Sequence, residues 1–335
     1  MKEVPIPKIS CDFVLHGLKN GKRLDGRKSF DYRDVNVMFV GDSGGCVASI
    51  GDTRVLAQVS AELGEPRPGR PTEGVLYVNL ELSPMASQGY QIYGMSEQAV
   101  ELGRLLEHCI KDCRCLDMES LCVISGQKVW QIRLDVNVLN YEGAIMDCVS
   151  VAAMTALSHF KRPDITVTGE DVKIHYDDKD PVALSVHHMP LCVTFAIFDH
   201  GNFIVVDPSA EEENIMEGLM VVAMNCNNEI CTIHMSGSMM LTKDQLLYCT
   251  KIAAVKVDEL TNVIKKFMQT SKLRSESKEM KKLITKQEAP QQFINIKGVK
   301  VDLNQEIHGQ MDVSHVQLEE SGLGVIENDS TWKKV

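Results

Sequence analysis

The sequence predicts an α/β (α+β) protein built from two similar strand-strand-helix units, followed by an extended C-terminal tail. Three observations favour this class. Apolar, β-branched segments recur between turns that contain glycine or aspartate, as strands do. Each of the two groups of strands leads into a stretch with apolar residues at helical spacing. After about Thr270 the chain becomes rich in lysine and glutamate and poor in apolar residues, which is typical of a tail.

The first half of the chain supplies one group of strands and three helices. Residues 9–20 predict a short amphipathic helix, and residues 96–112 predict a second helix with one broad apolar face. Between them lie the strand-like segments YRDVNVMF, GCVASIG, TRVLAQVSAEL and VLYVNLEL. A strand with period-two alternation then runs from Val129 to Asn140, and a helix is expected from Ile145 to Phe160. The alternating apolar side chains of that strand are Trp130, Ile132, Leu134, Val136 and Val138.

The second half repeats the plan more briefly. Strands are predicted in LCVTFAIF, NFIVVD, GLMVVAMN and EICTIHM. A long helix then begins at Thr242, because Thr242 and Gln245 have the spacing of a capping box. We therefore expect a body at residues 1–270 and a tail at 271–335. Within the body, the two units are expected at about 30–163 and 188–268.

Composition limits the possible functions. Apolar residues make up 44% of the chain and charged residues 24%, which matches a globular protein, and the net charge is −11. The charges from Ser271 onward balance, so the body carries the negative charge and does not bind nucleic acid through a general basic surface. The first residues, MKEVPIPK, lack an apolar signal core, and no run is long enough to span a bilayer. We expect an intracellular protein without membrane contact.

The cysteines indicate neither a disulfide framework nor a metal site. Their number is eleven, which is odd, and no CxxC pair occurs. The closest cluster, Cys109, Cys113 and Cys115, has spacings that fit no familiar zinc motif, and buried free cysteine usually behaves as a small hydrophobic residue. We predict no metal and no cofactor.

Several segments together resemble the RNase PH family. They are RLDGR at residues 23–27, TRVLAQVS, EGVLYVNLELSPMA, LDMESLCVISGQKVWQIRLDVNVLNYEG and HHMPLCVTFAIF, and the resemblance spans roughly residues 3–268. It is closest to the non-catalytic ring subunits of the eukaryotic RNA exosome. The resemblance implies an RNase PH-like fold of two ribosomal S5 domain 2-like units. The family's reaction is phosphorolysis, in which inorganic phosphate attacks the last phosphodiester bond of an RNA 3′ end.

The turn after Asn140 has the form of a phosphate site, since a glycine turn leads into a helix whose N-terminus attracts anions. The resemblance implies two glycines, an arginine and two hydroxyl residues here in active members, and this chain has GAIMD instead. Met146 cannot donate a hydrogen bond, and the carboxylate of Asp147, together with Glu142, is expected to repel phosphate. We interpret Gly143, Met146 and Asp147 as a degenerate phosphate site without catalytic residues.

Active relatives also carry aspartates near the strand that corresponds to FIVVDPSAEEENIMEG, where such residues bind a metal ion or move a proton. Asp207 occupies this region, but Pro208 is expected to reshape the turn. The three adjacent glutamates, residues 211–213, are interpreted as a solvated charged loop. In the RLDGR segment we interpret three charged residues as fold-stabilising or interface residues: Arg23, Asp25 and Arg27.

Arg104 and His108 lie four residues apart on a predicted helix, so their side chains emerge from one face. The resemblance implies two basic residues there that contact RNA phosphates in the ring's central channel. Such contacts position a strand without reading its sequence. A surface arginine next to a neutral histidine is an equally good interpretation.

Three hypotheses follow. The first is a catalytically inactive exosome ring subunit that assembles a six-membered ring as a heterodimer with another RNase PH-like subunit. The resemblance implies S1/KH-type cap subunits, an associated nuclease and RNA as further partners. It also implies roles in rRNA maturation and mRNA turnover, and a location in the nucleus, nucleolus and cytoplasm. In that assembly the tail segment FINIKGVKVDL is expected to bind a neighbouring subunit as an extended strand.

The second hypothesis is a phosphate-dependent 3′-to-5′ exoribonuclease that uses Asp207 and partner residues. An arginine in place of Met146 would favour it. The third is an unrelated α/β kinase-type protein, and the absence of a GxxxxGK[ST] loop counts against one large class of these.

Overall fold

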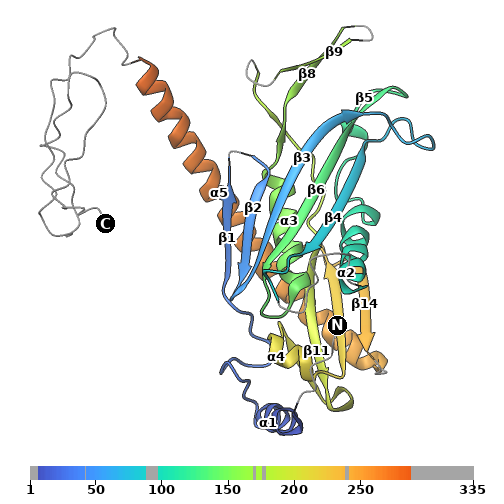
Figure 1. Ribbon diagram of the computed structural model, residues 1–335, viewed down its shortest axis with the longest axis vertical. Helices are drawn as coiled ribbons and strands as arrows, with labels where there is room; N and C mark the ends of the chain where they lie inside the picture. The colour runs from blue at the N-terminus through green and yellow to red at the C-terminus, as the bar shows by residue number, and fades with distance from the viewer. Residues whose placement is uncertain are drawn as a thin grey trace, which may run out of the picture. The chain divides into compact units, whose positions relative to one another are not determined.

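The computed structural model describes residues 7–41, 43–87, 97–168, 171–175, 179–237 and 241–287 (Figure 1). Contacts along the chain divide it into two units, Met1–Leu273 and Arg274–Val335. None of the described helices combines the length and the apolar character needed to cross a membrane.

The first sheet contains six strands, hydrogen-bonded in the order β1-β2-β3-β6-β4, with β5 paired to β6 beside this path. All pairs are antiparallel except β4 with β6, which is parallel. The alternation predicted for β6 is confirmed, because its five inward side chains are each at most 1% exposed. The strands are β1 (Val35–Val40), β2 (Gly45–Ile50), β3 (Thr53–Gly64), β4 (Val75–Leu82), β5 (Cys122–Ile124) and β6 (Lys128–Asn140).

The second sheet has the order β12-β11-β13-β14, and all its pairs are antiparallel. Every residue of β11 is buried, which explains why its sequence, LCVTFAIF, is almost continuously apolar. The strands are β11 (Leu191–Phe198), β12 (Phe203–Val206), β13 (Gly218–Met224) and β14 (Ile230–Gly237).

Helix α3 (Ile145–His159) contacts β2, β3 and β6 of the first sheet and β11 of the second. Its residues from 145 to 157 are all buried. A helix that is buried around its whole circumference is enclosed by other elements, and the small residues of this one, Ala152, Ala153 and Ala156 among them, allow strands to approach closely. This helix therefore joins the two sheets into one core, and the candidate phosphate site lies at its N-terminus.

Two further helices cover the sheets. Helix α2 (Glu97–Glu107) packs against β4 and continues as a π-helical turn, η1 (His108–Asp112). Helix α5 (Lys243–Gln287) begins after the predicted capping box, which is confirmed: Gln245 Oε1 accepts from the Thr242 amide at 2.9 Å. The buried face of α5 contains Cys249, Ala253, Val257, Leu260 and Ile264.

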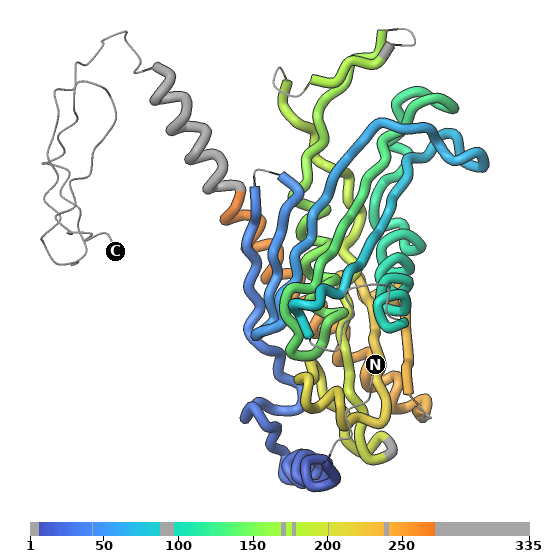
Figure 2. Tube along the Cα trace, in the orientation of Figure 1, coloured from blue at the N-terminus to red at the C-terminus, as the bar shows by residue number. Residues whose placement is uncertain are grey.

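The smaller elements connect these layers. Helix α1 packs Val14 and Leu18 on the second sheet near Phe198. The β8–β9 pair, which the sequence patterns did not indicate, is light green in Figure 2 and projects beyond the strands of the first sheet. The remaining elements are α1 (Lys8–Lys19), η2 (Glu119–Leu121), β7 (Lys161–Arg162), β8 (Asp164–Thr168), β9 (Asp171–His175), β10 (Val182–Ala183), η3 (Asp199–Gly201) and α4 (Ala210–Ile215).

The structure differs from the sequence prediction at the end of the body. Helix α5 does not stop near Thr270 but continues to Gln287. Residues 271–287 contain no glycine or proline and are rich in strong helix formers, so their sequence is compatible with continuation of the helix. The segment FINIKGVKVDL lies outside the described residues, and the assignment of 271–335 as a separate tail stays a prediction.

Candidate phosphate site and candidate RNA groove

The turn before α3 contains backbone angles in the left-handed region, which favours glycine. Gly143 has φ +94°, and Ala144 at the N-cap has φ +47°. A Cβ atom on Gly143 would lie 2.3 Å from the carbonyl oxygen of Pro208. The turn is therefore packed directly on the segment that leads from β12 into α4.

The amide at the start of α3 is already bound to an anion of the chain itself. The Ala144 N–H donates to Glu213 Oε1 at 2.7 Å, and the Tyr141 hydroxyl also hydrogen-bonds the Glu213 carboxylate. Burial raises the pKa of the Glu213 carboxyl, while the bonds from Tyr141 and Ala144 and the charge of Arg33 act in the opposite direction. The N-terminus of α3, where an anion would bind, thus already binds a carboxylate of the same chain.

Met146 and Asp147 both lie in the core, with exposed fractions of 2% and 0%. Asp147 Oδ1 accepts from the Thr194 hydroxyl at 2.5 Å, and the Tyr32 hydroxyl donates to Asp147 Oδ2. Burial raises the pKa of Asp147 to about 7, although these two hydrogen bonds lower it. The expectation that an incoming phosphate meets Asp147 is therefore wrong, because the carboxyl faces inward. Glu142 is exposed beside the turn.

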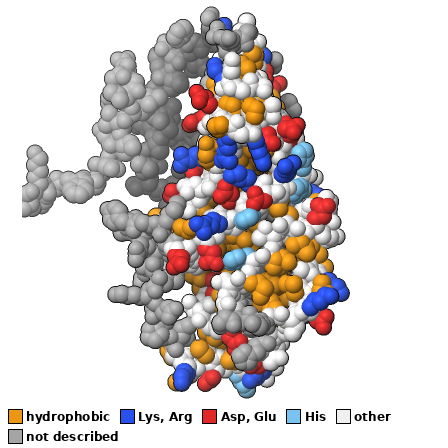
Figure 3. Space-filling view, turned by 90° about the vertical axis from the view of Figure 1, so that its right-hand side faces the viewer, with side chains coloured by type: hydrophobic (Ala, Val, Ile, Leu, Met, Phe, Trp, Pro, Cys, Tyr) orange, Lys and Arg blue, Asp and Glu red, His pale blue; other side chains and the backbone are white. Residues whose placement is uncertain are grey.

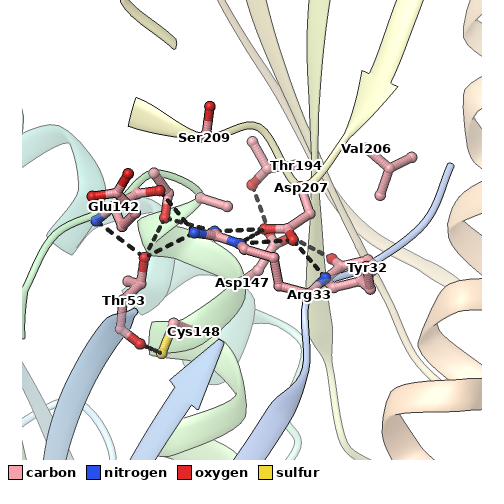
Figure 4. Close-up of polar contacts among 12 residues, drawn as sticks. Tyr32, Arg33, Thr53, Glu142, Asp147, Cys148, Thr194, Val206, Asp207 and Ser209 are labelled. Atoms are coloured by element: carbon pink, nitrogen blue, oxygen red, sulfur yellow. Dashed lines mark hydrogen bonds and ion pairs between the residues drawn. The ribbon is translucent and has the colours of Figure 1, made fainter. Parts of the chain in front are cut away.

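Asp207 is fully buried and held by two arginines, and Figure 4 shows its contacts with Arg33. Arg33 binds it with both ends of its fork, Nε to Oδ2 at 2.9 Å and Nη2 to Oδ1 at 2.7 Å, and Arg27 Nη1 donates to Oδ2 at 2.9 Å. The Arg33 guanidinium also donates to the carbonyls of Glu142 at 2.8 Å and Gly143 at 3.2 Å. Asp207 thus links β12 to the turn before α3, and its oxygens are occupied by these donors.

The three adjacent glutamates do not form a solvated loop, so that interpretation is wrong. They lie in α4, whose first turn has a capping box between Ser209 and Glu212. Glu212 is 0% exposed and pairs with Arg23, which is 5% exposed, through Nε to Oε1 at 3.0 Å and Nη2 to Oε2 at 2.5 Å. Arg23 also donates to two backbone carbonyls, those of residues 206 and 207. These contacts support the fold-stabilising interpretation of RLDGR.

Sequence patterns missed two residues of this network, Tyr32 and Arg33, and assigned a third, Glu213, to a solvated loop. One signal was available, because SAEE after Pro208 has the S-x-x-E spacing of a capping box and so indicates a helix start in place of a loop. Nothing in the local sequence of Arg33 indicates its bond to Asp207, since the two lie 174 residues apart.

Arg104 and His108 lie on one wall of a groove between α2–η1 and β14, with a volume of about 940 Å³. The facing wall contributes His234, whose Nε2 lies 2.9 Å from Glu101 Oε1. His108 Nδ1 pairs with Asp112, whereas Arg104 has no ion pair among the residues that the structure describes. Figure 3 looks onto this side of the molecule and shows acidic, basic and histidine side chains intermixed. Contact of this groove with RNA stays a prediction.

No group of three or more metal-ligating side chains with suitable geometry occurs among the described residues. Cys109 Sγ lies 3.8 Å from Cys192 Sγ, and both residues are buried in the core. The pKa of the Cys115 thiol is raised by burial to about 12, so this group stays protonated and is a poor metal ligand.

Comparison with known proteins gives consistent matches. The 3′ exoribonuclease family matches in two parts, domain 1 over residues 31–163 and domain 2 over residues 188–256. The chain is 46% identical over 317 residues to exosome complex component RRP45 of Danio rerio, covering 91% of this chain and 81% of that protein. It is 49% identical over 278 residues to exosome complex component RRP45 of Homo sapiens, covering 82% of this chain and 63% of that protein. The chain thus spans less than two thirds of the human relative.

Solved structures match as well. An Archaeoglobus fulgidus exosome with RNA bound to the active site has a chain that is 28% identical, with a TM-score of 0.68 over 76% of this chain and 97% of that chain. A chain of an archaeal exosome core is 26% identical, with a TM-score of 0.65 over 77% and 97% of the two chains. The predicted RNase PH-like fold is confirmed.

Proposed function

Since the chain belongs to the 3′ exoribonuclease family of RNase PH-like proteins, we propose that it is a catalytically silent ring subunit of an RNA exosome. It supports 3′-to-5′ RNA processing and degradation by completing the ring. In this proposal it forms a heterodimer with another RNase PH-like subunit, together with S1/KH-type cap subunits and an associated nuclease, in the nucleus, nucleolus and cytoplasm. The names of the relatives and the archaeal exosome structures support the ring.

The inference that the chain is catalytically silent rests on the N-terminus of α3, whose first amide is already bound. Phosphorolysis needs a cationic cradle that holds inorganic phosphate beside the scissile bond. Here the position of the expected arginine is the buried Met146, and the Ala144 amide is bound to Glu213. Arg33, the nearest guanidinium, is committed to Asp207 and to two carbonyls. The Ala144 amide and the Arg33 guanidinium are therefore already bound within the chain and are not free for a substrate phosphate.

Arg104 and His108 give the chain a role in guiding RNA. Arg104 projects into the groove beside α2 without an internal ion pair among the described residues, so its charge can meet a phosphate at no cost in lost contacts. His108 Nδ1 is already in contact with Asp112, so His108 contributes less to RNA binding. Contact with RNA must be local, since the chain as a whole carries a charge of −11.

The test combines assembly and activity. The full chain is co-expressed with an RNase PH-like exosome partner, and native mass spectrometry should find a heteromeric complex. A lone homo-oligomer that excludes the partner would refute the ring.

Phosphate-dependent release of nucleoside diphosphates from RNA is then measured for the wild type, Met146→Arg and, as a matched control for repacking, Met146→Leu. No activity is expected from any of them, because an arginine at 146 would start from the core and not from the groove surface. Robust wild-type activity would instead favour the exoribonuclease hypothesis.

A further inference from the structure

Cys113 and Cys231 come together from two elements that are distant in sequence. Cys113 directly follows the π-helical turn η1, and Cys231 lies in β14, the last strand of the second sheet, which contacts η1. The two thiols share a side-chain hydrogen bond. Both residues are only half-buried, so a small molecule from solvent can reach the pair.

An irregularity of the backbone accompanies each thiol. The register between β13 and β14 shifts between Ala223 and Met224, which makes Cys231 the extra residue of a β-bulge. Such a bulge changes the direction of a side chain. On the other side, α2 gives way to a π-helical turn before Cys113, and Arg114 directly after it has φ +49°. Irregularities of both kinds occur often at functional positions.

The hydrogen bond acts in opposite directions on the two thiols. Burial raises the pKa of Cys113, whereas the hydrogen bond with Cys231 lowers it. Burial raises the pKa of Cys231 to about 12, and the hydrogen bond with Cys113 raises it further. The contact therefore favours the thiolate of Cys113 over that of Cys231, and the thiolate is the form that attacks a disulfide.

A second close pair of thiols lacks access to solvent. Cys109 Sγ lies 3.8 Å from Cys192 Sγ, but neither residue is more than 1% exposed. Cys115, which lies near Cys113 and Cys231, is 0% exposed. Closeness and access to solvent are thus combined at Cys113 and Cys231.

The accessible pair lies at the groove between α2–η1 and β14. Cys113 Sγ lies 3.8 Å from the carbonyl oxygen of His108, which lines one wall of the groove. Thr232, the residue after Cys231, lines the other wall. A covalent bond between the two sulfur atoms would join these walls.

We propose that Cys113 and Cys231 form a reversible dithiol–disulfide pair that exchanges with a low-molecular-weight disulfide such as oxidised glutathione. The Cys113 thiolate attacks one sulfur atom of the oxidant, whose S–S bond breaks. One glutathione leaves as a thiolate and takes up a proton equivalent to the one that Cys113 released.

The Cys231 thiolate then attacks the Cys113 sulfur atom of this mixed disulfide. The second glutathione leaves as a thiolate and takes up the proton equivalent from Cys231. Two protein thiols are oxidised to one disulfide, and one glutathione disulfide is reduced to two glutathione thiols. The bond ties η1 to β14, and its formation does not depend on the proposed function.

The experiment equilibrates the reduced full chain at pH 8 with mixtures of reduced and oxidised glutathione. The chain is used both alone and with the co-expressed RNase PH-like partner, so failure of the ring does not affect the test. After acid quenching, the remaining thiols are alkylated and the peptides are mapped by mass spectrometry. We expect a Cys113–Cys231 linked peptide that increases with oxidised glutathione and disappears with dithiothreitol, while Cys109 and Cys192 stay reduced.

Two variants test the pairing. Cys231→Ser should abolish the linked peptide and leave Cys113 as a mixed disulfide with glutathione. The matched control Cys226→Ser, at a half-buried cysteine in the turn before β14, should form the linked peptide at the same glutathione ratio as the wild type.

The inference is overturned if the wild type forms no Cys113–Cys231 peptide at any glutathione ratio, or if Cys113 links to Cys226 as often as to Cys231. Equal losses of the linked peptide in Cys226→Ser and Cys231→Ser would overturn it as well. If Cys231→Ser does not fold, the peptide map of the wild type decides by itself.

Discussion

Replacing Asp147 by asparagine should change how the stability of the protein depends on pH. Asp147 is 0% exposed, and burial raises its pKa from 3.8 to about 7. A raised carboxyl pKa means that the folded state binds the proton more tightly than the unfolded state. The contribution of Asp147 to stability is therefore fully present below about pH 4 and is lost as the pH rises to about 7.

The magnitude follows from the size of the shift. One pKa unit corresponds to about 1.4 kcal/mol, so the wild type should lose about 3 kcal/mol through Asp147 between pH 5 and pH 8. Asparagine cannot ionise, and its amide can still accept from Thr194 and donate to the Tyr32 hydroxyl oxygen. The free energy of unfolding of Asp147→Asn minus that of the wild type should rise by about this amount over the same range.

The assay is denaturant unfolding at several pH values, followed by tryptophan fluorescence. One of the two tryptophans, Trp130, is 1% exposed in the core. The difference between variant and wild type cancels the other titrating groups. Asp52→Asn, the same substitution at an exposed aspartate, serves as the matched control. A difference for Asp147→Asn that stays constant from pH 5 to pH 8 would refute the reasoning.

Two further predictions concern the ion pairs and the groove. Arg23→Ala should destabilise the body by about 3–5 kcal/mol in denaturant unfolding, because it leaves the Glu212 carboxylate buried without its partner, whereas Arg70→Ala at an exposed pair should cost under about 1 kcal/mol. Equal effects would show that the Arg23 pair is dispensable. Arg104→Glu should weaken RNA binding by the assembled complex and make its salt dependence shallower by about 0.7 in logarithmic slope per lost phosphate contact, without loosening assembly. Loss of assembly instead would place Arg104 in a subunit interface. The control for nonspecific charge effects is Arg133→Glu, at an exposed arginine on β6.

The sequence by itself determined the elements whose signals are local. The strict alternation of β6 corresponds to five buried side chains, the Thr242–Gln245 spacing corresponds to an observed capping box, and the apolar sequence from Ile145 corresponds to an enclosed helix. These three predictions are correct because the strand alternation, the capping box and the apolar helix each depend on residues that lie close together in the sequence. The same local view also identified Gly143 as the residue of a tight turn.

Only the tertiary structure decided what the candidate site contains. The carboxylate on the Ala144 amide comes from 69 residues away, the partner of Arg33 from 174, and the partner of Arg23 from 189. No periodicity links such positions, and an isolated run of glutamates is ordinarily solvated. A carboxylate can be solvated at the surface or buried beside a cation or a hydrogen-bond donor, and the groups that the fold brings to it decide between these. The reason is that burying a carboxylate without a partner costs several kcal/mol, whereas a well-placed partner offsets this cost.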